Sequence, residues 1–225
     1  GRGMWMGTLT SAGVPSITSL NPSSGLAGSP AINLIVNGTN FTPASVVKWA
    51  GANRPTTYVS ETQIKAAISA ADLAFAQVVS VQVVTPPPGG GSSNIVNFSI
   101  NYPVPVLASV SPATKVAGGQ AFTLTLSGSG FANASKVLWN GVQRNSIYVD
   151  TNTLTATITA ADIATPGTFP VIVRNPAPGG GDSAPKNVTV KQLTPDRVVV
   201  SPKLITGGMS GNGAVYLNGQ APAGG

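Results

Sequence analysis

Hydrophobic and polar residues alternate in short runs along most of this chain. Residues 32–36 read Ile-Asn-Leu-Ile-Val and residues 122–126 read Phe-Thr-Leu-Thr-Leu, so every second side chain is apolar. The same alternation occurs in 79–83 and 96–100. A period of two places the apolar side chains on one face of a strand, so these segments are expected to be half-buried β-strands.

The strand pattern occurs twice, at a constant offset of 90 residues. Residues of the first copy match residues of the second without a gap; these pairs include Pro15 and Pro105, Pro22 and Pro112, Gly28 and Gly118, Gly38 and Gly128, Phe41 and Phe131, Trp49 and Trp139, Gly51 and Gly141, and Asp72 and Asp162. A fixed offset over this length indicates two copies of one structural module.

Turn residues separate the expected strands. Asn140-Gly141 suits a tight hairpin because both residues tolerate positive φ. The Pro- and Gly-rich loops at 85–91 and 175–181 are expected to join the last two strands of each copy. Helical character is confined to about one turn in each copy. About seven short strands per copy predict an all-β fold of two tandem antiparallel, immunoglobulin-like sandwiches.

Each copy places a tryptophan at the end of a further expected strand. Val47 and Trp49 alternate along residues 45–49, and Val137 and Trp139 do the same along 135–139. We therefore expect both tryptophans in the core, where a buried Trp anchors many sandwiches of this type, rather than on a sugar-stacking surface. The positions between them, Lys48 and Leu138, are expected to face outward.

Several motifs resemble those of the IPT/TIG domain, the immunoglobulin-like domain shared by plexins, certain transcription factors and bacterial surface proteins. The first copy opens on Val14-Pro15-x-Ile17-x-x-Leu20-x-Pro22, and Ala27-Gly28 and Leu34-x-Val36-x-Gly38-x-x-Phe41 follow; the second copy repeats all three motifs. The resemblance is strongest to the bacterial cell-surface or secreted type. It implies an immunoglobulin-like fold and a non-catalytic role, and it implies no substrate.

The repeat divides the chain into four parts. Residues 1–13 form an N-terminal extension, 14–102 the first domain, 103–191 the second, and 192–225 part of a third immunoglobulin-like module in the same register. Two interpretations of the ends compete: a segment of a longer repeat array, or ends that a neighbouring subunit completes by strand pairing. The second interpretation predicts head-to-tail assembly into an open filament, with 1–13 as a donor strand. The residues expected at this intersubunit contact are Met4, Trp5, Met6, Leu9, Val215 and Leu217.

The amino-acid composition excludes several kinds of functional site. The chain contains no cysteine and no histidine, which excludes Cys/His zinc sites, Cys or His nucleophiles and Ser-His-Asp triads. Charged residues make up only 8% of the 225 residues, and the net charge of +6 is dispersed. Without a basic stripe, nucleic-acid binding is not expected, and no apolar run is long enough to insert into a membrane. Low charge with abundant Gly, Ser, Thr and Asn favours an extracellular or cell-surface protein.

Two Arg–Tyr pairs are the candidates for a ligand surface. Arg54 precedes Tyr58, and Arg144 precedes Tyr148; arginine beside tyrosine can bind carboxylates, phosphates or sugars, although an exposed strand face also accounts for them. Asp72 and Asp162 are interpreted as caps of the helical turns, since one carboxylate per module is too few for paired acid–base chemistry.

No metal, cofactor or catalytic residue is expected. The six acidic residues are scattered, whereas calcium requires clustered oxygen ligands. The sequence therefore predicts a non-catalytic structural or adhesive building block of an extracellular assembly. Its partners would be copies of itself or neighbouring modules. The alternative is a carbohydrate-binding accessory region of a larger secreted protein, with a polysaccharide as partner.

Overall fold

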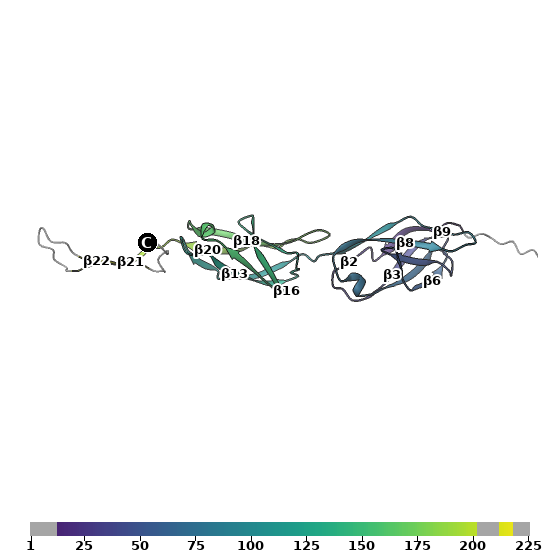
Figure 1. Ribbon diagram of the computed structural model, residues 1–225, viewed down its shortest axis with the longest axis horizontal. Coiled ribbons are helices and arrows are strands. Elements are labelled where there is room, and N and C mark those ends of the chain that lie inside the picture. Colours follow the sequence, from purple (N-terminus) through teal and green to yellow (C-terminus); the bar gives the residue numbers. More distant parts are fainter. Residues whose placement is uncertain (1–12, 202–211, 218–225) are drawn as a thin grey trace, which may run out of the picture. The chain divides into compact units, whose positions relative to one another are not determined.

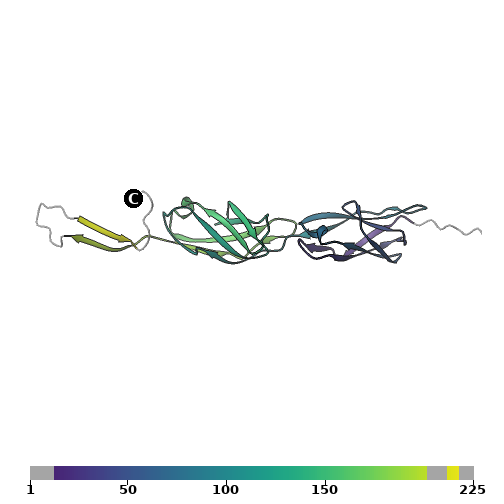
Figure 2. The same ribbon diagram turned by 60° about the horizontal axis from the view of Figure 1, so that its bottom comes forward.

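The computed structural model describes residues 13–201 and 212–217, and side-chain environments for residues 13–194. The chain divides into two compact units, one built on each repeat, and each is described by itself (Figures 1 and 2). Apart from one-turn 3₁₀ helices, their regular structure is β-strand. The predicted all-β fold of two tandem sandwiches is confirmed.

The first repeat is a sandwich of two sheets. One sheet has four strands in the order β1-β3-β7-β6, and the other has the order β2-β10-β8-β4-β5 with β9 paired to β8. The strands are β1 (Ser16–Asn21), β2 (Ser24–Leu26), β3 (Ile32–Thr39), β4 (Val46–Trp49), β5 (Ala52–Asn53), β6 (Thr56–Ser60), β7 (Gln63–Ile68), β8 (Gln77–Thr85), β9 (Gly91–Ser92) and β10 (Val96–Asn101). A single 3₁₀ turn, η1 (Ala71–Leu73), connects β7 to β8.

The second repeat has the same topology, with sheets β11-β13-β17-β16 and β12-β20-β18-β14-β15 and with β19 paired to β18. Its strands are β11 (Val106–Ser111), β12 (Thr114–Val116), β13 (Phe122–Ser129), β14 (Lys136–Trp139), β15 (Val142–Arg144), β16 (Ser146–Asp150), β17 (Thr153–Ile158), β18 (Gly167–Asn175), β19 (Gly181–Asp182) and β20 (Lys186–Lys191), with η2 (Ala160–Ile163) after β17. The predicted one-turn helices are therefore present in both repeats.

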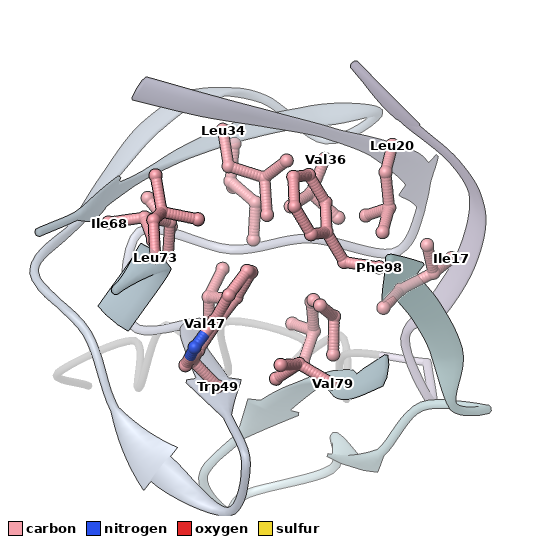
Figure 3. Close-up of a cluster of buried hydrophobic side chains, with 14 of the residues drawn as sticks. Ile17, Leu20, Leu34, Val36, Val47, Trp49, Ile68, Leu73, Val79 and Phe98 are labelled. Atoms are coloured by element: carbon pink, nitrogen blue, oxygen red, sulfur yellow. The ribbon is translucent and has the colours of Figure 1, made fainter. Parts of the chain in front are cut away.

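The inward side chains of both sheets form one core per repeat. Figure 3 shows the core of the first repeat. In β3, Leu34 and Val36 are fully buried, as the alternation predicts. Trp49 is 2% exposed and its ring lies 5.1 Å from that of Phe98, centroid to centroid. Trp139 is equally buried, 5.3 Å from Phe169. The prediction that both tryptophans belong to the core is confirmed.

The prediction for Leu138 is only half right. Leu138 lies outside the core cluster of its repeat, so it does face the outer side of its sheet, yet only 8% of it is exposed. Strand β14 lies between β15 and β18, and Leu138 stands opposite Gln143 on one side and Ile172 on the other. Neighbouring strands on both sides shield a side chain that a single-strand pattern assigns to solvent. Lys48, its counterpart, is half-buried.

The predicted turns are present. Asn140 and Gly141 have φ of 48° and 80° and connect β14 to β15, as expected for a tight hairpin. The Gly-rich loops also act as turns: Gly91 pairs with Thr85, and Gly181 pairs with Asn175. These loops lie between β8 and β10, and between β18 and β20, as the sequence indicates.

The first and last parts of each repeat run side by side in the same direction. β2 pairs in parallel with β10, with Ser24 opposite Ser99 and Leu26 opposite Asn101. β12 and β20 repeat this parallel pairing. β2 follows the first strand, β1, after two residues, and β10 is the last strand of the repeat, so the chain enters each sandwich at one end and leaves it at the other.

Two further strands follow the second repeat. β21 (Pro195–Ser201) and β22 (Asn212–Leu217) pair antiparallel in a two-stranded sheet. Their side-chain environments are not described, so the predicted contacts of Val215 and Leu217 remain predictions. Met4, Trp5, Met6 and Leu9 lie outside the described residues.

Candidate functional site

An arginine–aspartate ion pair joins two segments of the first repeat. Arg54, just after β5, donates from Nε to Asp72 Oδ2 at 3.0 Å, and its Nη2 donates to Asp72 Oδ1. Its Nη1 donates to the carbonyl oxygen of Asn53 at 3.1 Å. Asp72 Oδ2 also accepts the backbone N–H and the hydroxyl of Ser69. The aspartate thus stabilises the η1 turn and anchors the arginine.

The second repeat forms the same pair. Arg144 donates to both carboxylate oxygens of Asp162, and Asp162 completes a capping box with Thr159 at the start of η2. The hydrogen bond from Arg144 lowers the pKa of Asp162 to about 2, and the Thr159 N–H and hydroxyl act in the same direction. Because the carboxylate is held ionised, it can neither donate a proton nor serve as a raised-pKa acid. The predicted capping role of Asp162 is confirmed.

Both candidate arginines are therefore committed to structural contacts. In each guanidinium group, Nε donates a hydrogen bond to the aspartate and Nη1 donates to a backbone carbonyl oxygen. Tyr58 is exposed on the edge strand β6, whereas Tyr148 is half-buried and packs against the core of its repeat. A ligand surface formed by these four residues remains a proposal. The charge of each arginine is already neutralised by its aspartate partner.

A groove lies beside the first ion pair. It encloses about 560 Å³ over the start of β3 and the end of β7. Its lining is mostly aliphatic, with an amide, a hydroxyl and the ion pair at its polar positions; the residues are Ala31, Ile32, Asn33, Arg54, Pro55, Ala67, Ile68, Ser69 and Asp72. The sequence indicates Arg54 and Asp72 but not this groove, because small side chains such as Ala67 leave no signal in a strand pattern.

At the offset of 90 residues, the second repeat carries bulkier groups at several groove positions. Ala67 corresponds to Thr157, Ser69 to Thr159 and Ile32 to Phe122. Several side chains that line the groove of the first repeat thus differ from their counterparts in the second repeat.

The described residues contain few other candidate functional groups. Among residues 13–201 and 212–217, no three His, Cys, Asp or Glu side chains cluster in a way that could hold a metal ion. Over that same part of the chain, no helix is long and apolar enough to cross a membrane. A third arginine–aspartate pair, Arg174 with Asp182 at 2.5 Å, lies exposed at the Gly-rich loop of the second repeat.

Comparisons with known proteins agree with the repeat. The profile of the IPT/TIG domain matches residues 15–100 and again residues 105–191. No curated protein sequence matches the chain. Among solved structures, murine CEACAM1b is 13% identical over 79% of this chain and 99% of its own, with a TM-score of 0.38. The plexin A4 extracellular region is 16% identical over 76% of this chain and 18% of its own, with a TM-score of 0.30.

A Ca²⁺-stabilised, ice-binding adhesin of an Antarctic bacterium is 13% identical over 85% of this chain and 52% of its own, with a TM-score of 0.33. The family assignment rests on the profile, which covers most of the chain in two consecutive copies. The chain belongs to the IPT/TIG domain family, as a tandem pair of these domains.

Proposed function

We propose that this chain is a non-catalytic structural building block of an extracellular or cell-surface assembly. The observation that carries this proposal is that the chain enters and leaves each sandwich at opposite ends, because the parallel pairs β2–β10 and β12–β20 join its first and last parts. A module of this geometry extends a chain instead of folding it back. The ion pairs described above hold turns and offer no activated acid, base or nucleophile.

We further propose that copies of the chain join head to tail by strand complementation, with 1–13 as the donor strand. The sheet β21–β22 supports this, because within the described residues these two strands pair only with each other. A two-stranded sheet is marginal in water, since it cannot bury its apolar residues. Its free edges are therefore candidates for strand addition by another copy.

Electron microscopy and sedimentation of the purified full chain test this assembly. We expect filaments from the full chain and single particles from a variant lacking residues 1–13. A chain carrying Trp5→Ala and Leu9→Ala tests the same segment without shortening it. Normal filaments from the truncated chain contradict donor-strand joining, and single particles from the full chain at high concentration contradict self-assembly.

A second candidate function, binding of a neutral saccharide, is supported by the groove of the first repeat. Arg54 and Asp72 neutralise each other there, so the groove favours an uncharged ligand. Its aliphatic lining suits the C–H face of a sugar ring, and the exposed amide of Asn33 can both donate and accept hydrogen bonds. Glycan-array binding that Ala67→Thr abolishes, while the matched change Thr157→Ala does not, would establish this function.

A further inference from the structure

The parallel strand pairs determine how tension acts on each repeat. A force applied to the two ends of the chain reaches β1 and then β2 from one side and β10 from the other, so it pulls β2 and β10 in opposite directions along their own length. The backbone hydrogen bonds between them are then loaded together, instead of breaking one after another as in a peeled hairpin. The pairing extends by one bond beyond the strands, from Ala27 N–H to the Asn101 carbonyl at 2.9 Å. The second repeat has the equivalent bond from Ala117 N–H to the Lys191 carbonyl, at 2.8 Å.

One side chain adds a connection to the first repeat. Asn94, just before β10, accepts the backbone N–H of Ile17 on its Oδ1 at 2.8 Å, and its Nδ2 donates to the Ile17 carbonyl at 3.0 Å. The hydroxyl of Ser16 also donates to Asn94 Oδ1 at 3.3 Å. The amide therefore pairs with β1 as a peptide group of a neighbouring strand would. It ties β1, which belongs to the four-stranded sheet, to the opposite sheet.

Asn94 acts where tension enters the module. Ile17 is the second residue of β1, close to the point where the preceding chain would transmit force. β1 is otherwise held by its antiparallel pairing with β3, which shifts register between Ile17 and Ser19. The amide reinforces the strand beside this irregularity, so β1 must break bonds to both sheets before it can leave.

The second repeat has no such amide. Ala184 occupies the position equivalent to Asn94, and its methyl group can neither donate nor accept a hydrogen bond. Most of the arrangement is shared, including the irregularity in β11, between Leu107 and Ser109, and the three-residue parallel pair of β12 with β20. The second repeat adds one backbone bond to its parallel pair, from the Thr189 N–H to the Ala113 carbonyl at 2.9 Å, but this bond does not hold β11. The two repeats thus differ at the point where force is applied.

We infer that the chain is a two-stage tension-bearing element in which the second repeat opens at a lower force than the first, because Asn94 clamps β1 in the first repeat alone. This inference rests on the proposed structural function and adds to it the order in which the two repeats open under force. Under load the second repeat would unfold and lengthen the chain while the first stays closed. Opening under force follows the unfolding barrier, so hydrogen bonds loaded at the barrier control the rate.

Single-molecule force spectroscopy on the full chain, held at its two ends, tests the inference. We expect two opening events, each releasing roughly 30 nm for a repeat of this length. At constant force the first event should be about tenfold faster than the second, as expected for the loss of two hydrogen bonds. Asn94→Ala should bring the two rates together, and Ala184→Asn should slow the faster event.

The two variants separate the outcomes. Indistinguishable opening rates in the native chain, or a difference that Asn94→Ala leaves unchanged, overturn the inference. If Asn94→Ala does not fold, the test depends on Ala184→Asn. A slower opening of the second repeat in this variant supports the inference, and an unchanged opening rate overturns it. Gln143→Ala, which alters an exposed side chain of β15, serves as the control and should change neither rate.

The direction of pulling provides a second readout. The native chain has no cysteine, so Asn53→Cys introduces a unique attachment point at the β5 edge of its sheet. Pulling between this point and the C-terminus bypasses β1 and β2, so Asn94→Ala should then have little effect on the opening force. An equal effect in both directions would mean that Asn94 contributes general stability and no directional clamp. Filament formation is measured separately, so failure of either proposal leaves the other testable.

Discussion

Gly38 in β3 lies directly against the carbonyl oxygen of Ser16 in β1, so that a Cβ atom on Gly38 would overlap this oxygen. Gly128 has the same relationship to Val106 in the second repeat. In both repeats this contact lies beside the register shift between the first two strands of the four-stranded sheet. Glycine is required here because the two backbones approach too closely for any side chain.

Gly38→Ala and Gly128→Ala should each destabilise their repeat by roughly 3 kcal/mol, since the added methyl group must displace a backbone strand. Urea unfolding followed by intrinsic fluorescence measures the change, because each repeat carries its own core tryptophan. Gly51→Asn is the control: Gly51 has φ of 81°, a Cβ atom there would meet nothing within 4 Å, and asparagine tolerates this conformation. A loss for Gly38→Ala no larger than that of the control would contradict the close-approach argument.

The core tryptophan of the first repeat gives a second prediction. Trp49→Ala should cost about 3–5 kcal/mol, because it removes the largest aromatic group from a fully packed interior and leaves a cavity beside Phe98. Thermal unfolding by circular dichroism measures the loss. Phe75→Ala is the matched control, because Phe75 is 77% exposed and its truncation should change stability by less than about 0.5 kcal/mol.

A buried hydroxyl pair gives a third prediction. Ser45 Oγ lies 2.7 Å from Thr85 Oγ1 and accepts the N–H of Thr42 at 2.9 Å. Ser45→Ala should cost about 1–3 kcal/mol, since it leaves the buried Thr85 hydroxyl and the Thr42 N–H without this partner. Adding Thr85→Val removes the unpaired Thr85 hydroxyl and should restore part of the lost stability. If the losses of the two single variants simply add in the double variant, the two hydroxyl groups are not coupled in this way.

Local sequence patterns predict the fold well. The alternation in 32–36 and the Asn140-Gly141 turn depend on residues close in the chain, and the 90-residue repeat follows from comparing the chain with itself; all three are present in the structure. The inward position of Trp49 and Trp139 follows from the same alternation. Strand faces are set by a period of two, so a short segment is enough to determine them.

Contacts between distant segments cannot be predicted in the same way. Asn94 and Ile17 are far apart in the chain and meet only when the two sheets pack together. A strand pattern alone assigns Leu138 to solvent, because it does not reveal which strands lie on either side. The Arg54–Asp72 pair has one usable signal, since the same two residue types recur at the same separation as Arg144 and Asp162.

The pair formed by Arg144 and Asp162 predicts how the stability of the second repeat depends on pH. Arg144 lowers the folded-state pKa of Asp162 from 3.8 to about 2, so the folded state binds this proton less tightly than the unfolded state. The contribution is therefore complete above about pH 4 and is lost as the pH falls toward 2. It amounts to roughly 2 kcal/mol, because the Asp162 side chain is only 8% exposed and is little screened by solvent.

Asp162→Asn should lower the stability of the second repeat at pH 7 and flatten its pH dependence between 4 and 2, and urea unfolding across this range measures both effects. Asp182→Asn is the comparison, since the exposed Arg174–Asp182 pair also lowers the pKa of its carboxyl group. Because salt screens exposed charges more than buried ones, 0.5 M NaCl should suppress the effect of Asp182→Asn and leave that of Asp162→Asn largely intact. If Asp162→Asn keeps the acid sensitivity of the native chain, another carboxylate governs acid unfolding, and the ion pair does not hold η2 in place as its geometry indicates.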